Sequence, residues 1–271
     1  MPPPNFTGQI ADLWAKASAA TGTTRKCHYM PQFLMRRWAQ NEALTVQDIK
    51  TGFISTHPIK EIRKGKKKNA FLPVGFEIDL YSTWDGSKED RSTLEALFGR
   101  LEADTSELLN RLAANAWTFS DQDRFRLALF VAASALRVPV GIRAVQNDWQ
   151  ADFDQTSPGA TQKPGNTAHA LLKVIFKDTA EKLYANPHWA IVTFQPPNRQ
   201  HTGDIPLVLA TRGTVPVSND PSQWEVHMPL DPQALLTIGG MDAPGQPLPS
   251  GTYHGQTPYE WSPSGAITRI L

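Results

Sequence analysis

The 271-residue sequence predicts an α+β protein in which a helix-rich middle packs on short antiparallel or mixed strands. In the stretches 92–114 and 120–137, apolar residues recur at helical spacing. The last third of the chain has short apolar runs separated by Pro, Gly, Asn and Asp, a pattern typical of strands. Between residues 44 and 56, two β-prone runs joined by Lys50-Thr51-Gly52 predict an N-terminal hairpin.

Composition limits the compartment and the class of partner. Charged residues make up 20% of the chain and the net charge is +1, so no overall field directs the protein to nucleic acid or to a membrane. A single cysteine excludes an intramolecular disulfide and fits a reducing compartment. The N-terminus does not read as a signal peptide, and the apolar run 127–136 is too short to span a bilayer. We therefore expect a cytoplasmic protein that has no membrane partner.

The length of the chain is at the upper end for one domain, and no linker separates the predicted hairpin from the helices that must cover it. We predict a single domain over 1–271. It comprises an N-terminal helix within 1–26, a core over 27–238 and a tail rich in Pro and Gly over 239–271. The tail is expected to lack regular structure as far as Gly265, and 266–271 is compatible with an edge strand.

The remaining elements follow from local patterns. Thr7 is expected to cap the first helix. The alternation in 76–81 predicts a strand on which Glu77 and Asp79 share a face. An amphipathic helix is expected over 167–184, and strands over 188–194, 206–210 and 234–238.

The segment that we place at the centre of the protein is Cys27-His28-Tyr29-Met30-Pro31-Gln32-Phe33-Leu34-Met35-Arg36-Arg37-Trp38. Pro31 suits the first turn of a helix, so His28 would lie just before the helix start. A histidine there, with Arg36 and Arg37 one to two turns away, could form an anion site. The alternative is a buried histidine that holds a loop in place.

A basic run follows the hairpin, with six Lys or Arg residues between Lys60 and Lys68. Such a run can bind a phosphate backbone, so nucleic acid is one expected partner, with Lys66 and Lys67 among the contacts. No aromatic residue interleaves with these lysines, and the alternative is a solvated loop. The sequence names no protein partner.

Several catalytic signatures are absent from the sequence: the P-loop, the dinucleotide-binding glycine pattern, the His-Glu-x-x-His zinc motif and the Gly-x-Ser-x-Gly elbow. None of the seven histidines is paired with another at the spacing of metal ligands. Cys27 and His28 are adjacent in an extended segment, so their side chains would point to opposite faces. These absences weaken the common NTPase, Rossmann, zincin and hydrolase assignments.

The signature His28-Tyr29-Met30-Pro31-Gln32-Phe33, with Arg36-Arg37-Trp38 and the hairpin after it, resembles the bacterial family grouped as domain of unknown function 4238. The resemblance covers about His28 to Ile238 and implies the order of elements and the candidate residues, but no reaction. The further motifs that carry it are Leu80-Tyr81, Leu94-Glu95, Leu101-Glu102, Asp123-Arg124, Arg137-Val138-Pro139, Asp204-Ile205-Pro206 and Pro229-Leu230-Asp231-Pro232.

Two classes of function remain open. In the first, the protein is a metal-assisted hydrolase of phosphodiesters, a nuclease-like effector. Glu95 and Glu102 lie seven residues apart on one face of their helix and could hold Mg²⁺ or Mn²⁺. His28 would act as general base, assisted by Asp204. Arg36, Arg37 and Arg137 would bind the phosphate, together with Lys66 and Lys67.

In the second class, the protein is a non-enzymatic binding or interaction module. Glu95 and Glu102 would then pair with Arg36, Arg37 or Arg137 as partly buried structural ion pairs. The two classes differ in one observable feature of the structure. A hydrolase requires these residues to face a cleft that water can reach, whereas a binding module allows saturated Arg–Glu pairs in a closed core.

Overall fold

The computed structural model of the protein describes fifteen stretches of the chain. They are residues 5–20, 26–48, 51–59, 75–84, 89–90, 92–139, 141–143, 166–194, 202–203, 207–211, 224–239, 241–243, 246–247, 251–255 and 268–270.

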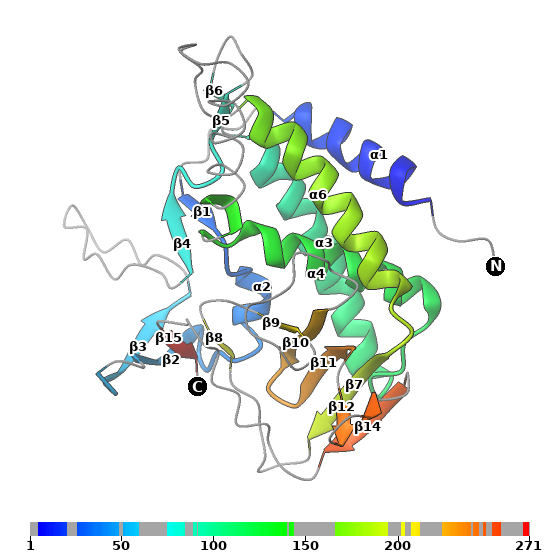
Figure 1. The fold of residues 1–271 in the computed structure, drawn as a ribbon. Helices are drawn as coiled ribbons and strands as arrows, with labels where there is room; N and C mark the ends of the chain where they lie inside the picture. Colours follow the sequence, from blue (N-terminus) through cyan, green and yellow to red (C-terminus); the bar gives the residue numbers. More distant parts are fainter. Residues whose placement is uncertain are drawn as a thin grey trace. The chain divides into compact units, whose positions relative to one another are not determined.

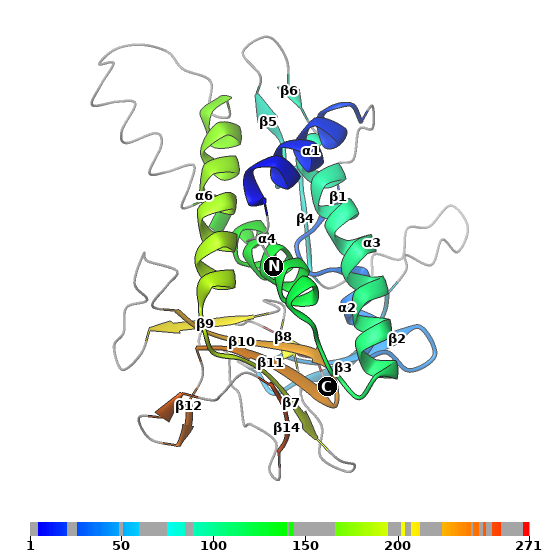
Figure 2. The ribbon, with the colours of Figure 1, turned by 90° about the vertical axis from the view of Figure 1, so that its right-hand side faces the viewer.

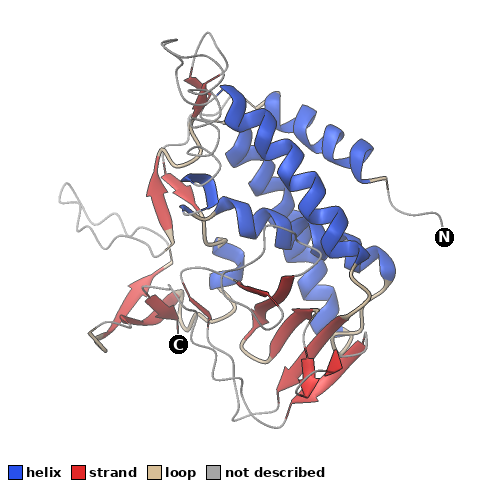
Figure 3. Cartoon of the chain, in the orientation of Figure 1, coloured by secondary structure: helices blue, strands red, loops and turns tan. Residues whose placement is uncertain are grey.

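Helices dominate the first two thirds of the chain and strands the last third (Figure 1; Figure 3). The helices are α1 (Phe6–Ser18), α2 (Gln32–Met35), α3 (Thr93–Ala114), α4 (Asp121–Arg137) and α6 (Asn166–Ala185). The strands are β1 (Lys26–His28), β2 (Ala43–Asp48), β3 (Ile54–Pro58), β4 (Phe76–Ile78), β5 (Thr83–Trp84), β6 (Glu89–Asp90), β7 (Trp189–Phe194), β8 (Thr202–Gly203), β9 (Val208–Thr211), β10 (Trp224–Asp231), β11 (Ala234–Ile238), β12 (Met241–Ala243), β13 (Gln246–Pro247), β14 (Gly251–Gly255) and β15 (Thr268–Ile270).

The chain forms two compact units, and each is assembled from three separate segments. The first unit contains Met1–Tyr29, Glu77–Thr105 and Phe125–Tyr184, and the second contains Met30–Phe76, Ser106–Arg124 and Ala185–Leu271. Both α3 and α4 contribute residues to each unit. Whether the whole chain unfolds as the predicted single domain stays a prediction.

In the first unit, aromatic side chains of α1, α4 and α6 are in contact. Figure 2 shows the ribbons of these three helices. The Phe6 ring of α1 lies edge-on to Phe125 of α4, with the ring centroids 4.6 Å apart. It also contacts Tyr184 of α6 at 5.5 Å. Edge-to-face pairs of this kind add stability beyond the area that they bury. None of the helices in the described ranges is both long and apolar enough to cross a lipid bilayer.

The second unit contains a five-stranded sheet in the order β14-β7-β11-β10-β9 and a four-stranded sheet in the order β3-β2-β15-β8. All pairs in these sheets are antiparallel except β14 with β7, which is parallel. Every side chain of β7 and β11 is buried, which explains why both sequences are apolar apart from one threonine each, Thr193 and Thr237.

The predicted α+β class is confirmed, and the long helices lie within one or two residues of their expected bounds. The hairpin is confirmed as well, because β2 and β3 pair antiparallel and Gly52 adopts a positive φ of 71° in the turn. Trp38 and Leu97 are buried, at 3% and 2% exposure.

A helix begins directly after Pro31, as predicted, and ends at Met35. Two local predictions were wrong. Asn5, and not Thr7, caps α1: its side chain accepts a hydrogen bond from the Gly8 N–H at 2.9 Å. The strand predicted over 76–81 ends at Ile78, because Asp79 has a φ of 56°, which strands do not contain.

The structure of the C-terminal part of the chain also differs from what the sequence predicted. β10, the longest strand among the described residues, was not predicted, because His227, Pro229 and the charged residues at its ends interrupt the apolar pattern, although residues 226–230 are all buried. The tail expected to lack regular structure contributes β14 to the larger sheet. β15 pairs with both β2 and β8, so it is an interior strand and not an edge strand.

Candidate functional site

Two predicted site residues of the first unit, Glu95 and Glu102, lie on one face of α3. Glu95, Phe98 and Glu102 are spaced by three and four residues, which places their side chains in a row along the helix. Arg137 reaches this row from the last turn of α4. The region around these four side chains is the Arg137 cluster.

Arg137 is saturated by its neighbours. Its Nη1 lies 2.7 Å from Glu102 Oε1, its Nη2 donates to the backbone carbonyl of His28, and its Nε donates to the Tyr81 hydroxyl at 3.3 Å. The guanidinium carbon lies 4.9 Å from the centroid of the Phe98 ring, which places a cation on an aromatic face. The Arg137 side chain is 2% exposed. A guanidinium with this set of partners has little capacity left to bind a substrate phosphate.

Tyr81 connects the parts of the cluster. Its hydroxyl lies 3.2 Å from the carbonyl oxygens of both His28 and Arg137, and it can share its proton between them. Burial raises the pKa of Tyr81, although the positive charge of Arg137 opposes this effect. The tyrosine therefore stays protonated and acts as a hydrogen-bond donor. The sequence held no signal for this role, because one Tyr in a turn has no diagnostic spacing.

Glu95, the second carboxyl group of the cluster, has a raised pKa. The pKa of Glu95 is raised from 4.5 to about 7: burial is the largest cause, the positive charge of Arg137 opposes it, and the negative charge of Glu102 adds to it. Its Oε2 atom is buried and has no hydrogen-bond partner among the described residues. A buried carboxylate oxygen without a donor is costly, so Glu95 holds a proton in part of the population near neutral pH.

Cys27 contributes no nucleophile to this cluster. Its side chain is buried, and burial raises the pKa of the thiol above its usual value. A thiolate is the reactive form of cysteine, so the thiol at this position is inert at neutral pH.

The structure brings together only some of the predicted site residues. Glu95, Glu102, Arg137 and the backbone of His28 meet in the first unit, whereas Arg36 and Arg37 belong to the second. Asp204, Lys66 and Lys67, and the basic run from Lys60 to Lys68 as a whole, lie outside the described residues. Their predicted roles stay predictions.

In the second unit, the two signature arginines have structural partners. Arg37 lies 3.3 Å from Asp231 Oδ2 and donates to Asn110 Oδ1 at 2.7 Å. Asp231 also accepts from the Gln233 N–H at 3.0 Å, which stabilises the turn between β10 and β11. Arg36 is exposed and lies 3.5 Å from Gln32 Oε1 on its own helical turn. Arg37 thus connects the signature to the β10–β11 turn.

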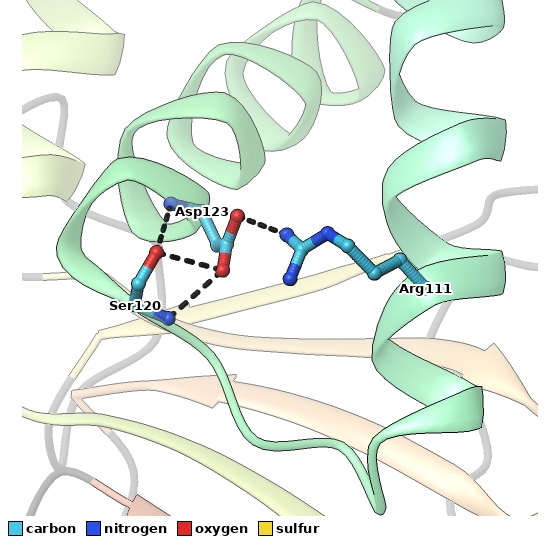
Figure 4. Close-up of polar contacts among 3 residues, drawn as sticks. All are labelled: Arg111, Ser120 and Asp123. Carbon is cyan, nitrogen blue, oxygen red and sulfur yellow. Dashed lines mark hydrogen bonds and ion pairs between the residues drawn. The ribbon is translucent and has the colours of Figure 1, made fainter.

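A further polar cluster of the second unit involves Asp123 (Figure 4). Asp123 Oδ2 accepts hydrogen bonds from the Ser120 N–H at 2.9 Å and from its hydroxyl at 2.8 Å, and Ser120 Oγ accepts from the Asp123 N–H. Arg111 donates to Asp123 Oδ1. Burial opposes ionisation of Asp123, but the Ser120 and Arg111 contacts prevail and lower its pKa. The Ser-x-x-Asp spacing before an apolar helix was the sequence signal for this cap.

The described residues contain no group of three or more His, Cys, Asp and Glu side chains that could hold a metal ion. Glu102 is already paired with Arg137, and Glu95 holds a proton more readily than an ordinary glutamate. Carboxylates must be deprotonated to bind a cation, so this arrangement does not favour Mg²⁺ or Mn²⁺. The predicted metal site would need a ligand from outside the described part of the chain.

A family model described as protein of unknown function (DUF4238) matches residues 26–244. The chain belongs to the DUF4238 family. No curated protein and no solved structure matches it. In this DUF4238 protein, residues from separate motifs of the family resemblance are in contact: His28, Tyr81, Glu102 and Arg137 in one unit, and Arg37 and Asp231 in the other.

Proposed function

We propose that this DUF4238 protein is a non-enzymatic binding or interaction module whose charged motif residues are structural. The saturation of Arg137 carries the proposal. Its guanidinium is almost fully buried, and it contacts Glu102, Tyr81, the His28 carbonyl and the Phe98 ring. A substrate-binding arginine needs free N–H groups directed at a cleft, whereas each of the three guanidinium nitrogens of Arg137 contacts a neighbouring group and the side chain is only 2% exposed. A cytoplasmic location belongs to the same proposal.

The environment of Arg37 and Asp123 supports the same conclusion. Both groups form ion pairs and hydrogen bonds that connect separate elements of the second unit. Partly buried pairs of this kind fix geometry more than they add stability. In an interaction module, they would hold the surface elements in a defined arrangement.

The test compares Arg137→Lys with Arg36→Lys as a matched control on an exposed arginine. Lysine keeps the charge but cannot make the forked contacts of a guanidinium. We expect Arg137→Lys to lower the melting temperature by several degrees and Arg36→Lys to leave it nearly unchanged. The wild-type protein is expected to cleave neither RNA nor DNA in the presence of Mg²⁺ or Mn²⁺. Cleavage by the wild type, lost in an Arg137→Lys variant that remains fully stable, would overturn the proposal.

The metal-assisted phosphodiester hydrolase is the second candidate, and Glu95 is the observation that favours it. Its carboxyl group is not in an ion pair with Arg137, and a pKa near 7 suits a general acid or base at neutral pH. Nucleic acid would bind through Lys60 to Lys68, and His28 would act as general base. This candidate predicts that His28→Ala abolishes divalent-dependent cleavage without changing the melting temperature, since the backbone carbonyl that binds Arg137 is retained.

A further inference from the structure

The strand β1 is short and has little strand pairing to hold it in place. It has three residues, and among the described residues it pairs only with β4, in a two-stranded sheet. A pairing of this length is marginally stable in water, so β1 depends on the side chains around it. The Tyr81 hydroxyl and the Arg137 guanidinium both contact the carbonyl oxygen of its last residue, His28. The position of β1 therefore depends on the Arg137 cluster.

Cys27, the middle residue of β1, is packed against the same cluster. Its side chain is buried, and the backbone N–H groups of Tyr81 and Leu80 form hydrogen bonds with its sulfur. The Glu95 carboxyl group lies close to both partners, because its negative charge helps to raise the pKa of the Cys27 thiol and that of the Tyr81 hydroxyl. Glu95 and β1 thus share one buried environment in the first unit.

The groups that face Glu95 do not favour its ionised form. Among the described residues, Arg137 is the cation that acts on it, but this guanidinium is already paired with Glu102 at 2.7 Å. The titratable groups from β1 and from the turn after β4, Cys27 and Tyr81, are neutral and buried. The positive end of α3 favours a carboxylate, since Glu95 lies in the first turn of that helix. Burial outweighs it, because Glu95 Oε2 is buried without a hydrogen-bond partner.

We propose that Glu95 is a pH-sensitive switch for β1: its protonated carboxyl group allows β1 to stay closed, and loss of the proton opens β1 and exposes Cys27. In the open state, water would solvate the carboxylate oxygen that has no donor in the closed state. Opening costs the contacts of the His28 carbonyl with Tyr81 and Arg137. The ion pair between Arg137 and Glu102 is retained, so α3 and α4 stay connected while β1 moves. The switch goes beyond the proposed function, and it operates in an interaction module and in a hydrolase alike.

The direction and size of the effect follow from the titration of Glu95. Its pKa is about 7 in the closed state, and it is expected to regain its ordinary value of 4.5 when β1 opens. The closed state is therefore favoured most below pH 4.5, and this advantage is lost as the pH rises to about 7. Between pH 6 and pH 8, the equilibrium constant for opening should rise about tenfold.

Cys27 is the only cysteine of the chain, so its alkylation reports the opening of β1 without an added label. The experiment measures the rate at which iodoacetamide modifies the full chain at about pH 6 and about pH 8. Each rate is divided by the rate for the same chain unfolded in urea at the same pH, which cancels the ionisation of an exposed thiol. We expect this labelling ratio to rise about tenfold in the wild type.

Glu95→Gln has no proton to lose at this position, so its labelling ratio should be nearly the same at both pH values. Glu107→Gln, at an exposed position of the same helix, is the matched control and should behave like the wild type. Circular dichroism checks that each variant is folded. The wild-type ratio decides the question by itself if Glu95→Gln does not fold.

Low concentrations of urea distinguish the opening of β1 from unfolding of the whole chain. A local opening exposes little surface, so the labelling ratio should change little, whereas labelling through global unfolding rises steeply with urea. A wild-type ratio that is the same at both pH values, an equal rise in folded Glu95→Gln, or a steep dependence on urea would each overturn the inference. None of these results bears on the cleavage assay, so failure of the switch and failure of the non-enzymatic function remain distinguishable.

Discussion

Arg137, the last residue of α4, pairs through Nη1 with Glu102 Oε1 across 2.7 Å and so connects the end of one helix to the middle of α3. The Arg137 side chain is 2% exposed and that of Glu102 is 22% exposed. The pair therefore has a buried cation and a carboxylate that is reached by solvent in part. This difference in burial determines how much free energy of unfolding each substitution should remove.

Glu102→Ala should lower the free energy of unfolding by about 3 kcal/mol, because it leaves a buried guanidinium without its counter-charge. Chemical denaturation measures the loss. Glu107→Ala, at an exposed position of the same helix, is the control and should change stability by less than about 0.5 kcal/mol. The double variant Glu102→Leu/Arg137→Met should lose less than the single variant, since no unpaired charge remains. Equal losses for Glu102→Ala and Glu107→Ala would contradict this account.

Glu95 should make the stability depend on pH in the range between its unfolded and folded pKa values. Burial raises the pKa from 4.5 to about 7, so between these values the folded chain holds a proton that the unfolded chain has released. Stability contributed by this proton is complete below pH 4.5 and is lost as the pH rises to about 7.

The matched comparison for this effect is Glu95→Gln, which imitates the protonated form. Relative to this variant, the wild type should lose about 2–3 kcal/mol of unfolding free energy as the pH rises through that range. Denaturation curves at a series of pH values measure the difference. A difference that does not change with pH would show that Glu95 is ionised in the folded protein.

Asp123→Ala should destabilise the second unit by about 1–2 kcal/mol, because it removes the acceptor for the Ser120 N–H and the partner of Arg111. The folded-state pKa of Asp123 is lowered, so its contribution is present above the usual value of 3.8 and is lost as the pH falls further. Thermal unfolding at neutral and acid pH measures both effects. Asp121→Ala is the control: Asp121 is 54% exposed and lies 3.8 Å from Arg124, and its loss should matter little.

Ala116→Gly should stabilise the protein by about 0.5–1 kcal/mol. Ala116 follows α3 with a φ of 51°, and the Trp117 N–H donates back to the Leu112 carbonyl at 2.7 Å, as in a helix C-terminal cap. Glycine adopts a positive φ without steric cost. Ala113→Gly, inside α3, is the control and should destabilise by a similar amount. A loss of stability in both variants would contradict the strain assigned to Ala116.

Elements whose formation depends on residues that are close together in the sequence could be predicted from the sequence. The helices α3, α4 and α6 bury one face at helical spacing, and that spacing is visible without any tertiary information. The hairpin was visible because Gly52 provides the positive φ that its turn needs. β10 was missed because Pro229 interrupts its pattern, although its partner β11 follows it directly in the chain. β14 was missed because glycines are not typical of strands and its partner β7 is distant in sequence.

The sequence by itself determined the fold class, the long helices, the family and a set of polar residues that were candidates for a functional site. Only the tertiary structure decided which of these residues meet. Arg137 and Glu102 are 35 residues apart, and Tyr81 and Arg137 are 56 apart. No local pattern encodes such a contact, because the energy of burying a charge depends on the partners that the folded chain brings to it. The structure assigned a backbone role to His28 and a proton to Glu95 for the same reason.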